Sequence, residues 1–178
     1  MTNENTLYAT LRLLQEQLYD KCGLELANLT LHPEGAAYGA CRFELAGQKV
    51  EHRISKITPT KTGQFVTIWK RGMKGATEPF DLSDDMDLIA ITARKGDQLG
   101  QFLFPKAVLA EKGIVSQDGK YGKRGIRVYP PWDIATSRQA EKTRNWQAGY
   151  FVAIKNDDTT DIGLAKRVLT EHHKQFEL

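Results

Sequence analysis

The sequence lacks the features that mark several specialised classes of protein. Only two of its 178 residues are cysteines, Cys22 and Cys41, which excludes a disulfide-stapled fold and a four-cysteine zinc site. No stretch approaches the roughly 18 apolar residues of a membrane-spanning helix. Residues 1–21 lack the basic start and apolar core of a secretion signal, and a formal net charge of +3 excludes a histone-like polycation. These absences predict a cytoplasmic protein with reduced thiols and no membrane insertion.

The length and the hydrophobic pattern predict one domain that spans residues 1–178. A hydrophobic fraction of 40% and a charged fraction of 26% are ordinary for a globular chain of this size. Leucines at every third or fourth position predict a helix over 6–21 that is ended by Gly23. Apolar runs bounded by turn residues predict strands at 37–46, 48–57, 63–71, 87–95, 101–105, 125–130 and 150–154, with further helices at 106–113, at 137–147 and from 161. The expected fold is α/β, with a mixed, largely antiparallel central sheet flanked by helices.

Charge is distributed unevenly along the chain. Residues 49–71 hold six basic side chains and one acid, namely Lys49, Arg53, Lys56, Lys61, Lys70 and Arg71 against Glu51. Residues 94–127 hold eight bases against three acids, whereas four acids and no base lie in residues 81–87. A basic, aromatic-containing pair of strands suits a polyanion, and nucleic acid is the commonest polyanion in a cell. The alternative is a solvated edge hairpin whose lysines prevent aggregation.

Two basic segments supply the predicted nucleic-acid contacts. These residues are Lys56, Lys61, Lys70, Arg71, Lys120, Lys123, Arg124 and Arg127. Glycines around residues 119–125 would let backbone amides approach phosphates, and arginine binds phosphate through two N–H groups. Tyr129 and Trp132 could stack on bases, although a tryptophan that packs in the core is the alternative. Such contacts predict weakly sequence-specific, salt-sensitive binding of DNA or RNA.

A polar helix extends the basic surface. The segment 137–147 carries Arg138, Lys142 and Arg144, while its apolar positions are few. Together with the two basic segments these three cations favour polyanion binding. For the cations of the glycine loop around residues 119–125 the alternative is plain solvation.

Four motifs resemble those of the MepB family of bacterial proteins. They are KITPTKTGQFVTIWKR (56–71), GQFLFPKAVLAEKGI (100–114), GKRGIRVYPPWD (122–133) and RQAEKTRNWQAGYF (138–151). The resemblance covers most of the chain and implies a restriction-endonuclease-like core. The family takes its name from a gene that neighbours a multidrug efflux pump. This gives an alternative function, that of a non-enzymatic accessory or ligand-binding protein which uses the acids of residues 81–87 and the lysine and arginine clusters for partner contact.

The same resemblance implies a place to look for nuclease chemistry. Nucleases of this fold carry an acid at the start of one strand and an acid-x-lysine motif on its partner, and the carboxylates hold Mg²⁺. Asp87 fits the first acid and a metal ligand, and Lys106 fits the lysine, but Phe104 stands where the second acid belongs. A second set starts at Glu44 and continues as Glu51-His52-Arg53, with arginine in place of lysine. The catalytic candidates are therefore Glu44, Asp87 and Lys106. They predict at most a metal-dependent nuclease with a degenerate acid-x-lysine motif. Mg²⁺ is expected as a cofactor only if the protein cuts nucleic acid.

One further arrangement could support nucleophilic catalysis. His52 follows Cys41 by eleven residues across a predicted hairpin, so the two side chains could face each other. A thiol of this kind is more often buried and inert, because a reactive cysteine needs a cationic, accessible environment. The inert thiol is the expectation here.

Overall fold

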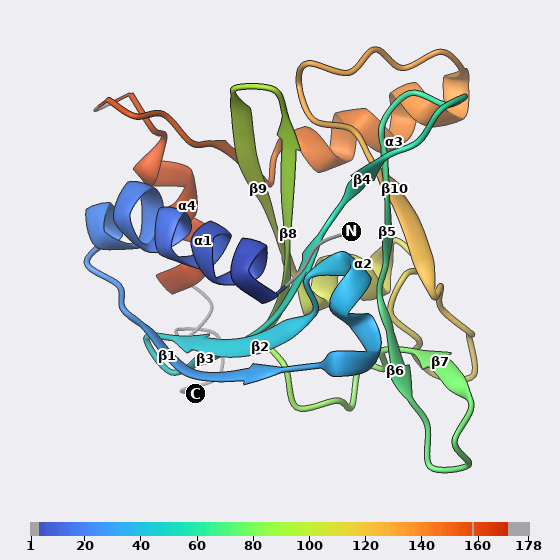
Figure 1. Ribbon diagram of the computed structural model, residues 1–178. Helices are drawn as coiled ribbons and strands as arrows, with labels where there is room; N and C mark the ends of the chain where they lie inside the picture. The colour runs from blue at the N-terminus through green and yellow to red at the C-terminus, as the bar shows by residue number, and fades with distance from the viewer. Residues whose placement is uncertain (1–3, 158, 171–178) are drawn as a thin grey trace.

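The computed structural model describes residues 4–157 and 159–170, and a six-stranded sheet forms its centre (Figure 1). The strand order is β1-β2-β3-β8-β9-β11. Strands β3 and β8 run parallel, and every other neighbouring pair is antiparallel. The strands are β1 (Leu26–Leu31), β2 (Cys41–Leu45), β3 (Gln48–Ile54), β8 (Leu88–Lys95), β9 (Gln98–Pro105) and β11 (Phe151–Ala153). The expected single-domain fold with a mixed, largely antiparallel sheet is confirmed.

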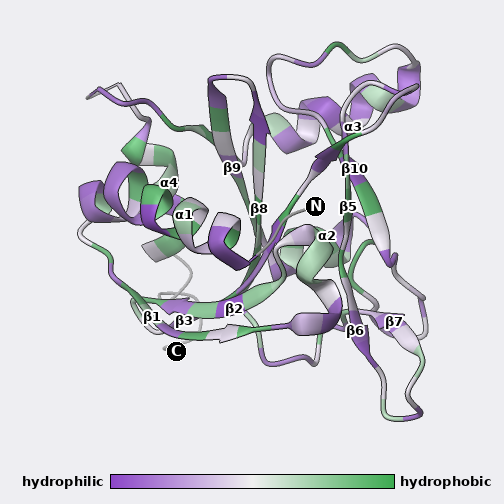
Figure 2. Ribbon diagram, viewed as in Figure 1, coloured by the Kyte–Doolittle hydropathy of each residue, from purple (hydrophilic) through white to green (hydrophobic). Residues whose placement is uncertain are grey.

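Two helical segments cover one face of this sheet (Figure 1). Helix α1 (Glu4–Leu14) continues through a π turn (Gln15–Tyr19) and a 3₁₀ turn (Asp20–Cys22), and α4 (Ile162–Thr170) lies beside it. Figure 2 shows hydrophobic and hydrophilic residues alternating along α1, as an amphipathic helix requires. The leucines at 7, 11, 14 and 18 are all buried, and Gly23 ends the segment with a φ of 71°. The helix predicted over 6–21 is confirmed.

The other face packs against a second, smaller sheet and two helices. The sheet has the order β10-β5-β4, with β10 (Gly125–Val128), β5 (Gln64–Thr67) and β4 (Lys56–Ile57). Helices α2 (Lys106–Glu111) and α3 (Arg138–Ala148) and the hairpin β6 (Trp69–Arg71) with β7 (Thr77–Pro79) complete this side. Side chains alternate between the two faces of β8, so this strand contributes to both cores. Leu88 and Ala90 pack in the core under α1, and Ile89 and Ile91 pack in the core under the small sheet.

The structure differs from the sequence prediction at several places. The strand expected over 48–57 is divided at Ser55, because β3 belongs to the central sheet and β4 to the small sheet. The strand expected over 63–71 is divided between two sheets, because β5 pairs with β4 and β10 while β6 pairs with β7. The strand expected over 37–46 is shorter, because a 3₁₀ helix, η3 (Pro33–Tyr38), precedes β2. Strand β1 had no recognisable pattern, since this edge strand is half exposed and is interrupted by Asn28 at a φ of 55°.

A chain of polar side chains runs through the buried core between β3, β8 and β9. The Tyr19 hydroxyl donates to Gln101 Oε1 (2.8 Å), and Gln101 Nε2 donates to Thr92 Oγ1 (3.1 Å). His52 Nε2 lies 2.9 Å from that hydroxyl, and His52 Nδ1 lies 3.1 Å from the Gly39 carbonyl oxygen. A neutral ring protonated at Nδ1 satisfies both partners, so every donor in the chain has an acceptor. The network therefore requires an uncharged His52.

Burial lowers the pKa of His52 to about 4. The unfolded chain has a histidine pKa near 6.5, so between these values the unfolded state binds the proton and the folded state does not. The free energy of unfolding should therefore fall by roughly 3 kcal/mol as the pH drops from about 6.5 to 4. Urea unfolding of the protein and of His52→Gln across this range tests the point. A pH slope that is equally steep in the variant would contradict it.

Candidate functional site

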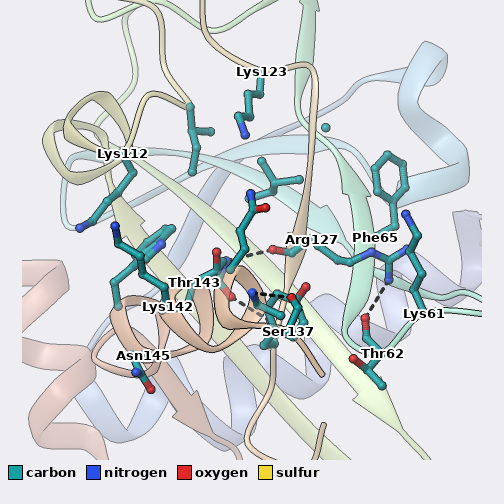
Figure 3. A pocket seen from close by; sticks show the side chains of 18 of the residues that line it. Lys61, Thr62, Phe65, Lys112, Lys123, Arg127, Ser137, Lys142, Thr143 and Asn145 are labelled. Carbon is teal, nitrogen blue, oxygen red and sulfur yellow. Dashed lines mark hydrogen bonds between the residues drawn. The ribbon is translucent and has the colours of Figure 1, made fainter. Parts of the chain in front are cut away.

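A large groove lies between the small sheet, the end of α2 and helix α3 (Figure 3). Its volume is about 1490 Å³. Five cations line it, against the single acid Glu111, and they are Lys61, Lys112, Lys123, Arg127 and Lys142. Figure 3 shows Lys112 and Lys142 on one side and Lys61 on the other, with Arg127 between them. We call this feature the basic groove.

Arg127 holds one wall of the basic groove in place. It pairs with Phe65 across β10 and β5, and its guanidinium reaches the loop that precedes β5. Nη1 donates to the Thr62 carbonyl oxygen (3.1 Å), and Nη2 donates to the Thr58 hydroxyl (2.9 Å). Lys61 belongs to this loop, so Arg127 orders a neighbouring cation as well as contributing its own charge.

Gly63 lets the same loop pack closely against β10. Its φ is 74°, a conformation that side-chain-bearing residues rarely adopt. A Cβ at this position would lie 2.8 Å from the Tyr129 ring and 2.9 Å from the Val128 carbonyl oxygen. The loop from Thr58 to Gly63 is therefore anchored at both of its ends, at Thr58 by Arg127 and at Gly63 by close packing.

Helix α3 forms the opposite wall. Ser137 caps it by accepting a hydrogen bond from the Ala140 amide (3.1 Å), a role that serine often has at the start of a helix. Gln147, which is 1% exposed, accepts from the Tyr129 amide (2.8 Å) and donates to the Arg127 carbonyl oxygen (3.0 Å). Through these two hydrogen bonds Gln147 holds α3 against β10. Its role was missed from the sequence, because a glutamine near a helix end carries no local signal of burial.

The groove cations keep their charge available. Among the described residues none of the five forms an ion pair, and Lys112 lies 5.7 Å from the centre of the Trp146 ring. Lys70 differs, because its ammonium lies 2.6 Å from Asp84 and 3.5 Å from Glu78. A cation without a partner acid loses no ion pair when it binds a polyanion.

The predicted nucleic-acid contacts fall into separate groups. Three of them, Lys61, Lys123 and Arg127, line the basic groove. Arg71 is paired with Glu34 (3.1 Å), as Lys70 is with its own acids. The remaining contacts lie outside the groove: Lys56 lies 4.2 Å from the centre of the Tyr38 ring, Lys120 is exposed on a loop, and Arg124 donates to Thr77. All eight stay predictions.

Trp132, which was predicted to stack on bases, and Trp146, which lines the basic groove, are both partly buried and pack against other aromatic rings. Trp132 meets Phe151 edge-on with ring centres 5.7 Å apart, and Trp146 lies 5.2 Å from Phe104. Tyr129 is only partly buried and lines the basic groove. It is the aromatic side chain of this set that remains placed for stacking.

The three catalytic candidates come to one end of the central sheet. Glu44 pairs with Lys49 across β2 and β3, and the Lys49 amide donates to the Asp87 carboxylate (2.7 Å). The Lys106 amide in turn donates to the Asp87 carbonyl oxygen (3.0 Å). The fold therefore places Glu44 in β2, Asp87 just before β8 and Lys106 just after β9 in one row at this end of the sheet. Their side chains, however, form hydrogen bonds to other groups and not to one another.

The surroundings of this row do not suit Mg²⁺. Glu44 accepts a hydrogen bond from Asn28 (2.9 Å), and the Lys106 ammonium donates to the Asp84 carbonyl oxygen (2.9 Å). The part of the chain that the structure describes contains no cluster of three or more histidine, cysteine or acidic side chains able to hold a metal. Mg²⁺ prefers several oxygen ligands in octahedral array. The described residues therefore do not fit the metal, and no catalytic step follows from it.

The acids of residues 81–87 are tied into the protein. Asp84 pairs with Lys70, and Asp85 pairs with Lys49 and Arg42. The hydrogen bond from Lys49 lowers the pKa of Asp85, and bonds from Ser83 lower that of Asp81. The ion pairs with Arg42 of β2 and Lys49 of β3 hold this segment against the end of the central sheet.

Cys41 is fully buried, which is the environment expected of an unreactive thiol. Its sulfur lies 3.6 Å from His52 Nδ1, so the two side chains do face each other across the hairpin. Burial nevertheless raises the pKa of Cys41 to about 12, and His52 donates to a backbone carbonyl instead. A protonated thiol beside a hydrogen-bonded ring does not form a nucleophilic pair.

Comparison with known proteins places this architecture in a family. A family model described as MepB-like matches residues 32–153. The chain belongs to the MepB-like family. A crystal structure of MepB is similar to it with a TM-score of 0.72 and 31% sequence identity, over 85% of this chain and 99% of that one. A search of curated proteins finds no match. The MepB-like region includes both walls of the basic groove, while a restriction-endonuclease-like core stays a prediction.

None of the helices in residues 4–157 and 159–170 has the length and apolar character needed to cross a bilayer.

Replacing Arg127 by alanine should destabilise the protein by about 1–2 kcal/mol, because the Thr58 and Thr62 oxygens lose a charged donor. Lys61→Ala removes an exposed cation from the same loop and should change the free energy of unfolding by less than about 0.5 kcal/mol. Urea unfolding of both variants measures the difference. Equal effects would show that Arg127 does not anchor the loop.

Proposed function

We propose that the protein binds nucleic acid through the basic groove with weak sequence specificity. The observation that carries this proposal is the lining, in which five cations without ion pairs among the described residues face one acid. Phosphate contacts dominate the affinity of such a surface, because each one releases counterions from the nucleic acid.

The groove offers phosphate contacts from separated parts of the chain. Lys61 and Lys123 are exposed on loops, and Lys142 is exposed on α3. Long lysine side chains bind phosphates at varied positions and carry no base-reading geometry. This arrangement favours binding to the backbone of DNA or RNA over recognition of one sequence.

The chemistry is proposed to be binding without cutting. A restriction-endonuclease-like scaffold with a degenerate site accounts for the row of Glu44, Asp87 and Lys106, whose side-chain partners leave no oxygen cluster for Mg²⁺ among the described residues. Nucleic acid as the ligand would place the protein in the cytoplasm. The alternative, an accessory protein of an efflux system, would use the acids at residues 81–87, which in the described part of the chain already contact other residues of the protein.

Removing two groove cations should weaken binding and its salt dependence together. Lys123→Ala with Lys142→Ala removes two phosphate contacts, so the slope of log affinity against log salt should fall by roughly 1.4 for single strands and 1.8 for duplex DNA. Fluorescence anisotropy of a labelled oligonucleotide at several salt concentrations measures both quantities.

The matched control is Lys74→Ala with Arg94→Ala. It removes the same charge from exposed positions outside the groove. This variant should keep the affinity and slope of the unchanged protein. If both double variants lose affinity alike, net charge and not the groove governs binding. If the unchanged protein does not bind even at low salt, the proposed function is lost.

A further inference from the structure

A second, smaller pocket opens beside β3 and β6. Its volume is about 210 Å³. The residues that matter for its chemistry are His32, Glu51, Arg53, Trp69, Arg71 and Phe80. Their side chains come from β3, from β6, from the residues next to η3 and from the segment after β7. We call it the Glu51 pocket.

Two charged side chains of this pocket are almost fully buried. Glu51 is 4% exposed and Arg53 is 5% exposed. Arg53 Nη1 donates to the His52 carbonyl oxygen (2.8 Å) and more distantly to Glu51 Oε2 (3.4 Å), while His32 Nε2 lies 3.1 Å from the same oxygen. Buried ions are costly unless their hydrogen bonds are complete. The contact between Glu51 and Arg53 is long, and His32 and Arg42 are the other charged or ionisable partners of the Glu51 carboxylate among the described residues.

Unused hydrogen-bonding capacity remains on both groups. The nearest cation to Glu51 Oε1 is Arg42 at 3.6 Å, and this oxygen accepts no hydrogen bond from the described residues. Arg53 carries five N–H donors, and its hydrogen bonds to the described residues come only from Nη1 and, over a longer distance (3.4 Å), from Nη2 to the Trp69 carbonyl oxygen. The pocket therefore presents an acceptor and a donor side by side.

The walls of the pocket are aromatic. Trp69 is partly buried, and the Arg53 guanidinium lies 5.8 Å from the centre of the buried Phe80 ring. An anion entering here would meet the Glu51 carboxylate, and a cation would meet Arg53. A neutral, planar group with its own donors and acceptors is repelled neither by the carboxylate nor by the guanidinium, and a nucleobase is such a group.

The Glu51 pocket and the basic groove share one strand face. Along residues 64–71 alternate side chains point the same way, and Val66 and Ile68 point into the core. On the opposite face Phe65 lines the groove, while Thr67, Trp69 and Arg71 line the pocket. A strand of nucleic acid that follows this face would pass from one site to the other.

We infer that the Glu51 pocket takes one unstacked nucleobase from a single strand held in the basic groove. Glu51 Oε1 accepts from the base and Arg53 donates to it, while Trp69 supplies a stacking surface. This inference rests on the proposed function and adds a base-dependent contact to its phosphate contacts.

The test compares labelled single-stranded oligodeoxynucleotides of equal length, with bases and with an abasic backbone, by fluorescence anisotropy. The unchanged protein should bind the base-bearing strand about five- to tenfold more tightly, the effect of one stacked base. Trp69→Leu removes the stacking surface and should bring that ratio close to one, and Glu51→Ala removes the acceptor and should lower it. Both variants should retain affinity for the abasic strand and its salt slope, which also shows that they are folded.

The outcomes separate this inference from the proposed function. A ratio below twofold in the unchanged protein, with salt-sensitive binding to both strands, overturns the base pocket and leaves the groove intact. A ratio that survives in both variants places the base contact elsewhere and also overturns the inference. Absence of binding to either strand at low salt removes both proposals.

Discussion

The alternation of side chains along residues 64–71 is the constraint on which both proposed sites depend. Val66 and Ile68 are buried in the core beneath the small sheet, so the intervening side chains must point outward. Phe65 thereby lines the basic groove and Trp69 lines the Glu51 pocket. Arg127, paired with Phe65 across β10, holds the preceding loop through its Thr58 and Thr62 oxygens. A shift of one residue in the pairing would turn these side chains into the core and remove the groove wall.

Strand β3 shows how neighbouring residues meet the cost of burial in different ways. His52 faces the layer under α1, where it stays neutral and every hydrogen bond is complete. Glu51 and Arg53 face the opposite layer, where they remain charged partners at a long distance. The neutral network stabilises the sheet, because no charge is desolvated. The charged pair leaves hydrogen-bonding groups beside a cavity, which is the arrangement expected of a binding site and not of a pure core.

Much of the fold could be read from local pattern. The leucine spacing of α1, the Gly96 turn between β8 and β9 and the Ser137 cap of α3 each depend on residues close together in sequence. The edge strand β1 could not be read, because its half-exposed side chains alternate irregularly around a bulge. The division of 63–71 between two sheets was equally hidden, since the partners β4, β10 and β7 are chosen by long-range pairing.

The sequence alone determined the family motifs, the amphipathic elements and the basic character of the segments around residues 49–71 and 119–127. Only the tertiary structure decided which cations have a partner acid among the described residues. Lys70 and Arg71 look like Lys61 and Lys123 in the sequence, but the fold places Asp84 and Glu34 beside the first two and brings Lys112 and Lys142 to the others. Ion pairing depends on distances of a few ångströms between residues remote in sequence, and such distances exist only after the chain has folded.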